Sequence, residues 1–300
     1  MAACAACAVR LNPVHNQIRI RANTASGIYH GLQTRYDGRI GRQLLLGSSY
    51  TYSKAIDNVS EVFGFLGQGS LVVSQNPFDI GRGERGLSGN DLHHVWTMNF
   101  VWDLPFMKEQ RGFLGRMLGG WSASGIYRRT GGRPMQPVQF SSGTPTVTDR
   151  DFNATFFGYF DSLRPFSANP NAEVRSLGFV TPAGQLVDYN NRNRPVTLSD
   201  VRWVFNNLDA ARYFGTPFGA GRGVLRGPKV SDGDFAVFKS WKIRESWSLQ
   251  YRFEATNIFN HPTLGVPNLQ ADSGTTSTWL NATETEATPR IIQMGLRLTF

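Results

Sequence analysis

The last twelve residues of the chain constrain its fold more than any other stretch. In residues 289–300, Gln293, Gly295, Arg297 and Thr299 alternate with apolar side chains. Only a strand has this period of two, because successive side chains of a strand point to opposite faces of a sheet. The alternation is typical of the closing strand of a membrane β-barrel, in which ~9–11 tilted residues cross the bilayer. The apolar members are Ile292, Met294, Leu296, Leu298 and Phe300.

The same alternation recurs upstream and predicts about seven or eight antiparallel strands in sequence order. The first two form a hairpin around a glycine-rich turn at residues 37–42, and residues 92–104 carry the strongest aromatic pattern. Arg128 and Arg129 are adjacent within one strand, so one of them must point to the apolar side near a strand end. The predicted strands before the last one are 28–37, 43–54, 92–104, 120–130, 234–243 and 247–256.

The connections alternate in length and predict which end of each strand lies outside the cell. Outer-membrane barrels combine short periplasmic turns with long extracellular loops, and this phase leaves the chain ending on the periplasmic side. We expect an all-β fold: residues 28–300 as an antiparallel barrel segment, after an irregular segment 1–27 in which 17–22 alternates as a short strand would. A short helix is expected at 207–213. Short connections are 37–42, 105–119 and 244–246, and long ones are 55–91, 131–233 and 260–288.

Composition narrows the function classes. The net charge is +9, from 31 Lys and Arg against 22 Asp and Glu, but no block of five basic residues occurs, so we predict no nucleic-acid surface. No run of eighteen apolar residues predicts a helical membrane span. The N-terminus lacks the basic and apolar regions of an export signal, and we expect that signal to lie outside this sequence.

Seven stretches carry recognisable motifs: residues 29–33, 50–57, 84–88, 91–94, 132–134, 253–262 and 289–300. Together they resemble the C-terminal part of the barrel of TonB-dependent outer-membrane receptors of the Oar-like group. That group begins with a carboxypeptidase-regulatory-like domain and a plug, and uses a barrel of about twenty-two strands for uptake of bulky solutes. The resemblance therefore implies an incomplete barrel, with plug and TonB-binding segment present only in a full-length form.

The two faces of the predicted strands supply the candidate functional residues. On the polar face, Arg35, Arg252, Glu254 and Arg297 are lumen-facing candidates that could hold a plug or guide an unknown solute, or simply solvate the lumen. The resemblance implies that barrel-assembly machinery reads the terminal Phe300. Outer-membrane lipid is the expected partner of an apolar belt formed by Trp96, Phe100, Trp102, Tyr251, Phe253, Leu296 and Leu298.

Motifs that would indicate an enzyme or a cofactor lack their structural context, so we predict neither. Cys4 and Cys7 have CxxC spacing without a second pair. Residues 81–86 fit GxGxxG, but no strand precedes them and no helix follows. His93 and His94 would point to opposite faces of a strand, which disfavours a shared metal ion with Asp91. No GxSxG elbow occurs in the sequence.

Two alternatives stay open at this point: a soluble β-sandwich that binds carbohydrate or a protein, and a small independent porin. In a sandwich the aromatic belt would be buried between two packed sheets, whereas in a barrel it would be exposed around one curved sheet. A small porin would require the first and last strands to pair.

Overall fold

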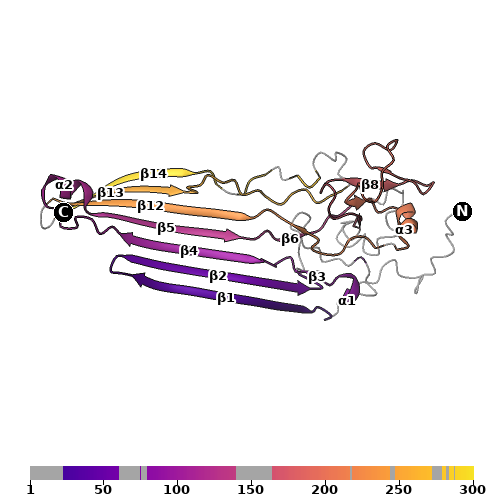
Figure 1. The fold of residues 1–300 in the computed structure, drawn as a ribbon, viewed down its shortest axis with the longest axis horizontal. Helices are drawn as coiled ribbons and strands as arrows, with labels where there is room; N and C mark the ends of the chain where they lie inside the picture. Colours follow the sequence, from indigo (N-terminus) through magenta and orange to yellow (C-terminus); the bar gives the residue numbers. More distant parts are fainter. Residues whose placement is uncertain are drawn as a thin grey trace, which may run out of the picture.

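The computed structural model describes residues 23–60, 75, 80–139, 164–216, 218–243, 247–271, 279–281, 284–286 and 288–300. One antiparallel sheet dominates it, and its long strands follow one another in sequence order (Figure 1). The predicted all-β meander is thereby confirmed. The seven long strands are β1 (Gly27–Ile40), β2 (Leu44–Asp57), β4 (His94–Asp103), β5 (Trp121–Thr130), β12 (Val230–Lys242), β13 (Ser248–Thr256) and β14 (Ile291–Thr299).

The long sheet is open in the described part of the chain. Strand β1 pairs only with β2, and β14 pairs only with β13, so each presents an edge. Every neighbouring pair is antiparallel. With seven strands, β1 and β14 therefore run in the same direction, and a direct pairing between them would be parallel.

The connections gather at two different ends of the sheet (Figure 1). At the turn end lie the turn after β1, the C-terminus and α2 (Gly112–Leu118), which precedes β5. At the loop end lie α1 (Ile80–Gly83), β3 (Gly86–Leu87) and the described parts of the long connections. The predicted alternation of short and long connections thus separates the two ends of the molecule.

The described residues of 131–229 and 260–288 form what we call the loop unit. Strands β7 (Phe166–Ser167), β8 (Leu177–Val180), β9 (Leu186–Asp188) and β10 (Trp203–Val204) make a small sheet in the order β7-β10-β8-β9. Helix α3 (Leu208–Phe214) contacts β8. Strands β6 (Pro134–Met135) and β11 (Leu225–Arg226) form a separate pair. The loop unit has a core of its own, which includes Trp203, Phe205, Leu177 and Trp279.

Several boundaries differ from the sequence-based prediction. The first turn was placed at 37–42, but β1 continues to Ile40 because Asp37 and Gly38 stay in register with β2. Gly41, with φ of 61°, makes the turn. The connection 105–119 contains α2, which was not predicted. The predicted helix at 207–213 is confirmed as α3, whose first turn is capped by the Asn207 side chain.

Register divides the long sheet into two faces, because antiparallel partners point to the same side. Ile292 is opposite Ala255, which is opposite Phe235, and this row continues to Gly125 and Phe100. We call this side the apolar face and the other side the polar face. All six carboxylate residues of the seven strands lie on the polar face: Asp37, Asp57, Asp103, Asp232, Asp234 and Glu254.

Two sequence-based expectations lie outside the described residues. These are the short strand at 17–22 and the turn at 244–246. Among the described residues, no helix has both the length and the apolar character needed to cross a membrane.

Candidate functional site

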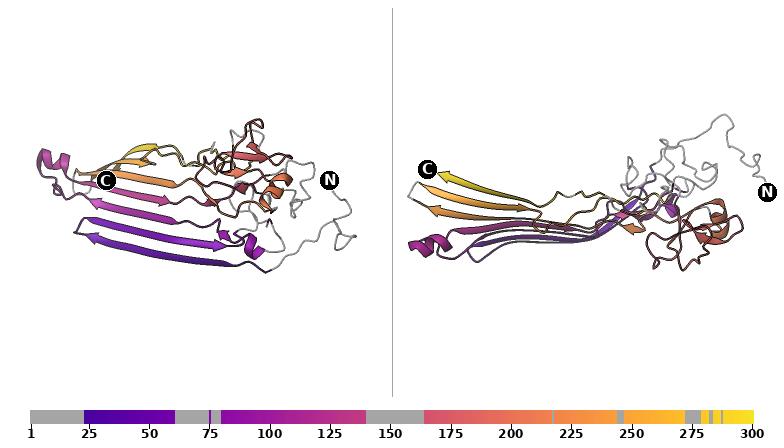
Figure 2. Two further views of the ribbon diagram at one scale, coloured as in Figure 1. Left: turned by 45° about the vertical axis from the view of Figure 1, so that its right-hand side comes forward. Right: turned by 90° about the horizontal axis from the view of Figure 1, so that it is seen from above.

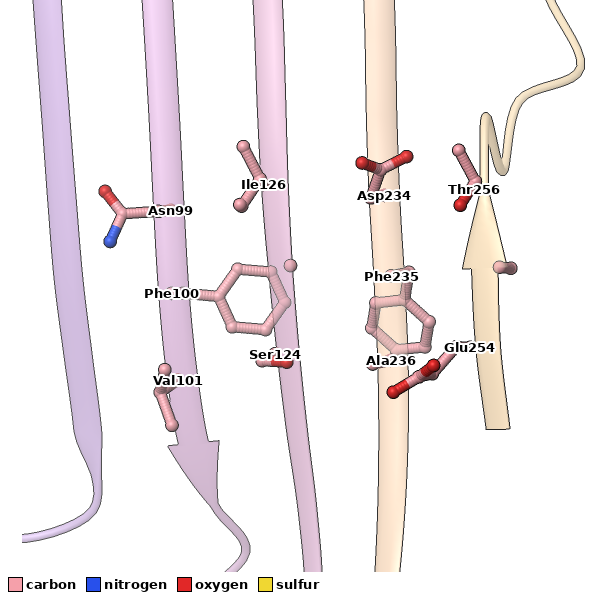
Figure 3. Close-up of a pocket in the computed structure, with 12 residues that line it drawn as sticks. Asn99, Phe100, Val101, Ser124, Ile126, Asp234, Phe235, Ala236, Glu254 and Thr256 are labelled. Carbon is pink, nitrogen blue, oxygen red and sulfur yellow. The ribbon is translucent and has the colours of Figure 1, made fainter. Parts of the chain in front are cut away.

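A shallow hollow on the polar face, about 440 Å³ in volume, is the candidate site. It crosses four neighbouring strands, β4, β5, β12 and β13, where small side chains leave room between larger ones. Asn99, Ser124 and Thr256 contribute polar side chains, and Ile126 contributes an apolar wall. Figure 3 shows two carboxylates, Asp234 and Glu254, entering the hollow from β12 and β13.

The position of Asp234 is fixed by the chain that leaves β13. Its Oδ1 accepts a hydrogen bond of 3.1 Å from the backbone N–H of Asn257. Asn257 is buried with φ of 49°, a conformation that asparagine tolerates better than most residues. Its amide nitrogen donates to the backbone carbonyls of His261 (3.2 Å) and Thr288 (3.0 Å). One asparagine therefore ties the hollow to the start of β14.

Glu254 is the second carboxylate of the hollow. It lies opposite Ala236 on one side and Gln293 on the other. Within the described ranges no cation pairs with it. Together with the amide and hydroxyl groups around it, Glu254 can accept hydrogen bonds from a polar solute or attract a cation.

The described residues include no group of three His, Cys, Asp or Glu side chains placed to hold a metal ion. Asp91, His93 and His94 are each engaged separately. The Asp91 carboxylate accepts from the backbone N–H of Ala55 (2.6 Å) and pairs with Arg226 (2.5 Å). His94 Nδ1 and the Tyr50 hydroxyl are 2.8 Å apart, and the His93 ring packs on Tyr52.

Three of the four predicted lumen candidates lie close together. Arg252, Glu254 and Arg297 occupy the polar face of the adjacent strands β13 and β14. The Arg252 guanidinium lies 5.7 Å from the Phe238 ring, and its Nε donates to Gln250. Arg35 lies on the same face but on β1, at the other edge of the sheet, where it pairs with Asp37.

The residues predicted to form the lipid-facing belt all fall on the apolar face. Leu296 and Leu298 are 72% and 48% exposed, and Trp102 is 39% exposed, so nothing in the described chain covers them. The others are Trp96, Phe100, Tyr251 and Phe253, which are partly buried by neighbours in the same sheet. Cations interrupt this face only toward the strand ends, at Lys54 and Arg129 at the loop end and at Lys239 at the turn end.

Lys239 and Phe300 mark the turn end of the apolar face. The Lys239 ammonium lies between the rings of Trp121 (5.4 Å) and Trp241 (5.3 Å) and donates to the carbonyl of Gly119. A long cationic side chain with aromatic neighbours is characteristic of a membrane interface. Phe300 is 83% exposed and packs on Trp247, with 5.9 Å between ring centroids.

Buried ion pairs at the loop end are structural features that the sequence did not reveal. Glu84 and Arg164 are 2.7 Å apart and almost fully buried, and Arg222 and Asp57 are 3.1 Å apart. Together with the pair of Arg226 and Asp91, they link the loop unit to the ends of the long strands. The motifs at 84–88 and 91–94 contain two of the acids, but their partners lie 80 or more residues away.

An antiparallel meander with one apolar and one polar face, and with short and long connections at opposite ends, is typical of an outer-membrane β-barrel protein. The sequence profile of the outer membrane beta barrel domain family matches residues 2–293, so the chain belongs to that family. Membership implies an outer-membrane location. Comparisons with curated proteins and with solved structures found no match.

Proposed function

We propose that the chain is the barrel portion of a TonB-dependent outer-membrane receptor of the Oar-like type, which takes up a bulky solute without a chemical step. A full-length form would supply the plug and the TonB-binding segment. Barrel-assembly machinery and outer-membrane lipid are the partners expected for such a barrel. The proposal rests on the motifs that resemble this group and on the two faces of the sheet.

The observation that most supports the proposal is the distribution of carboxylates between the two faces of the sheet. Every Asp and Glu of the seven strands lies on the polar face, including Asp234 and Glu254 of the hollow. Carboxylates are expensive at lipid depth, whereas a water-filled lumen hydrates them. With Arg252 and Arg297 on the same face, nearer the turn end, they form a mixed polar wall that suits hydrogen bonding to a solute or to a plug.

The direction of the edge strands disfavours a small porin that these seven strands would close by themselves. Strands β1 and β14 run the same way, so closing these seven strands alone would need a parallel pair. Bacterial single-chain barrels have even numbers of antiparallel strands. Pairing both edges with further antiparallel strands would satisfy their backbone groups, as lipid requires.

The sandwich alternative requires a second sheet against the belt. Among the described residues no second layer covers the middle of either face, and the sheet is a single curved layer when viewed from its edge (Figure 2). The exposure of Leu296 and Trp102 agrees with a lipid-facing belt and disfavours a sandwich interior.

Uptake and conductance measurements separate the receptor from the porin. Cells that make the natural full-length protein would be given fluorescent oligosaccharides and peptides too large for general porins. We expect uptake of at least one probe, abolished by deletion of TonB. Uptake that persists without TonB, together with stable ion conductance of the 300-residue chain in planar bilayers, would favour the porin and reject the receptor.

A further inference from the structure

A second hollow, about 490 Å³ in volume, lies at the loop end of β5 and β12. Register places its strand residues on the apolar face: Tyr127 is opposite Gly233 and Arg129 is opposite Ser231, in line with Trp96. The hollow therefore opens to the outside of the proposed barrel, at the extracellular level. Its lining residues are Tyr127, Arg129, Lys229, Ser231, Phe259, His261 and Pro262.

The titratable Arg, Lys and His side chains that line this hollow are all basic. Arg129, Lys229 and His261 are exposed donors, and no Asp or Glu is among the lining residues. In the part of the chain that the structure describes, no carboxylate pairs with Arg129 or Lys229. An arginine on a face that carries few charges needs an anionic partner or water around its guanidinium group. The arrangement is complementary to an anion with several acceptor oxygens.

Beside the cations lies an aromatic floor. The Phe259 ring is 57% exposed and packs edge to face on Tyr127, with centroids 5.9 Å apart. It sits directly on Gly233, where a Cβ atom would come within 2.8 Å of the ring. Tyr127 is held by its hydroxyl, 3.0 Å from Ser231 Oγ, and packs in turn on Trp96. The floor is therefore continuous with the belt.

We propose that Arg129, Lys229 and His261 bind the phosphate-bearing headgroup of an outer-leaflet lipid, whose acyl chain lies along Phe259, Tyr127 and Trp96. The proposal rests on the proposed membrane orientation and goes beyond it, because it assigns a specific lipid site to the outer surface. It also gives a role to Phe259, His261 and Pro262, which end the 253–262 motif and lie away from the lumen. Cations at this level attract anionic lipid, and an aromatic surface accepts its chain.

The full-length protein in uncharged detergent would be titrated with monophosphoryl lipid A, with bound lipid counted by native mass spectrometry. Removing both cations with Arg129→Gln and Lys229→Gln should weaken binding at least tenfold. The matched control, Arg128→Gln with Lys242→Gln, removes two exposed charges from the polar face and should leave binding unchanged. Arg129→Lys should retain most of the affinity, because it keeps the charge.

Two further arms identify the source of the phosphate. The same lipid without its phosphate should bind the wild type at least tenfold more weakly, and millimolar inorganic phosphate should not displace the intact lipid. Equal binding of the two lipids, displacement by free phosphate, or equal losses in the two double variants would overturn the proposal.

Heat-modifiable gel migration separates this proposal from the proposed function. If every variant migrates as a folded barrel but the affinity for the lipid is the same with and without Arg129 and Lys229, only the proposed lipid site is wrong. If the wild type shows no heat-modifiable barrel, the membrane orientation fails and the lipid site fails with it.

Discussion

The long sheet and the loop unit differ in where their large apolar side chains lie: the loop unit buries many of them, whereas the sheet leaves many exposed. Of the buried apolar side chains that the structure describes, only Ala123 and Ala255 belong to the seven long strands, whereas Trp203, Phe205 and Trp279 belong to the loop unit. The loop unit builds a core as a water-soluble domain does. The sheet leaves its large side chains uncovered, because in the proposed setting lipid covers one face and the lumen wets the other.

The long sheet therefore lacks the buried core that a water-soluble domain of its size would have. A sheet with an apolar face exposed to water would be an aggregation hazard. In a bilayer, lipid would cover the same face, and water in the lumen would hydrate the polar face with all six carboxylates. Mutations should therefore act by different rules in the two regions.

The largest effect is expected at the buried pair that Arg164 of the loop unit forms with Glu84, which lies just before β3. Glu84→Gln leaves a buried guanidinium facing a neutral amide, which should destabilise the loop unit by about 3–5 kcal/mol. The readout is protease cleavage of the loop unit at the cell surface, with heat-modifiable migration of the sheet measured in parallel. Glu109→Gln, which breaks an exposed pair with Arg111, is the matched control and should change neither readout. Equal sensitivity of both variants would show that burial does not stabilise the loop unit.

Next in size is a charge on the apolar face of the sheet. Leu296→Arg should cost about 2–4 kcal/mol near the bilayer midplane, whereas Arg297→Gln on the polar face should cost little. The midpoint of urea unfolding in vesicles, followed by gel migration, measures both. Similar midpoints for the two variants would remove the distinction between the faces.

A smaller effect is expected at the start of α3. The Asn207 side chain accepts from the backbone N–H of Ala210 (2.6 Å) and donates to the carbonyl of Val180 (2.9 Å). Asn207→Ala should destabilise the loop unit by about 1–2 kcal/mol without altering the sheet. Thermal unfolding followed by tryptophan fluorescence would show it. Asn207→Asp keeps the cap acceptor and should recover part of the loss; no recovery would mean that the cap contributes nothing.

The long strands were predictable because the alternation of apolar and polar side chains can be recognised within each segment by itself. Residues 92–104 and 289–300 predicted β4 and β14 to within a few residues. The first turn was misplaced because Asp37 and Gly38 have turn chemistry, yet pairing with β2 keeps them in the strand. Tertiary pairing prevailed over local propensity there.

The candidate site was predictable only in part. Glu254 and Arg252 were placed on the polar face by alternation alone, but the hollow also needs Asn99, Ser124 and Asp234 from three other strands. Their alignment depends on register across the sheet, which no single segment encodes. The ion pairs of the loop unit join residues far apart in sequence, and no periodic pattern in the sequence indicates which residues pair.

Spin labels placed one at a time along residues 291–299 of the full-length protein in vesicles test the central claim most directly. The account predicts that labels at 292, 294, 296 and 298 collide mainly with oxygen, which concentrates in lipid, and that labels at 293, 295, 297 and 299 collide mainly with a water-soluble nickel chelate. This period of two would confirm one lipid-facing and one hydrated face. Equal access of the nickel chelate to both sets would contradict it.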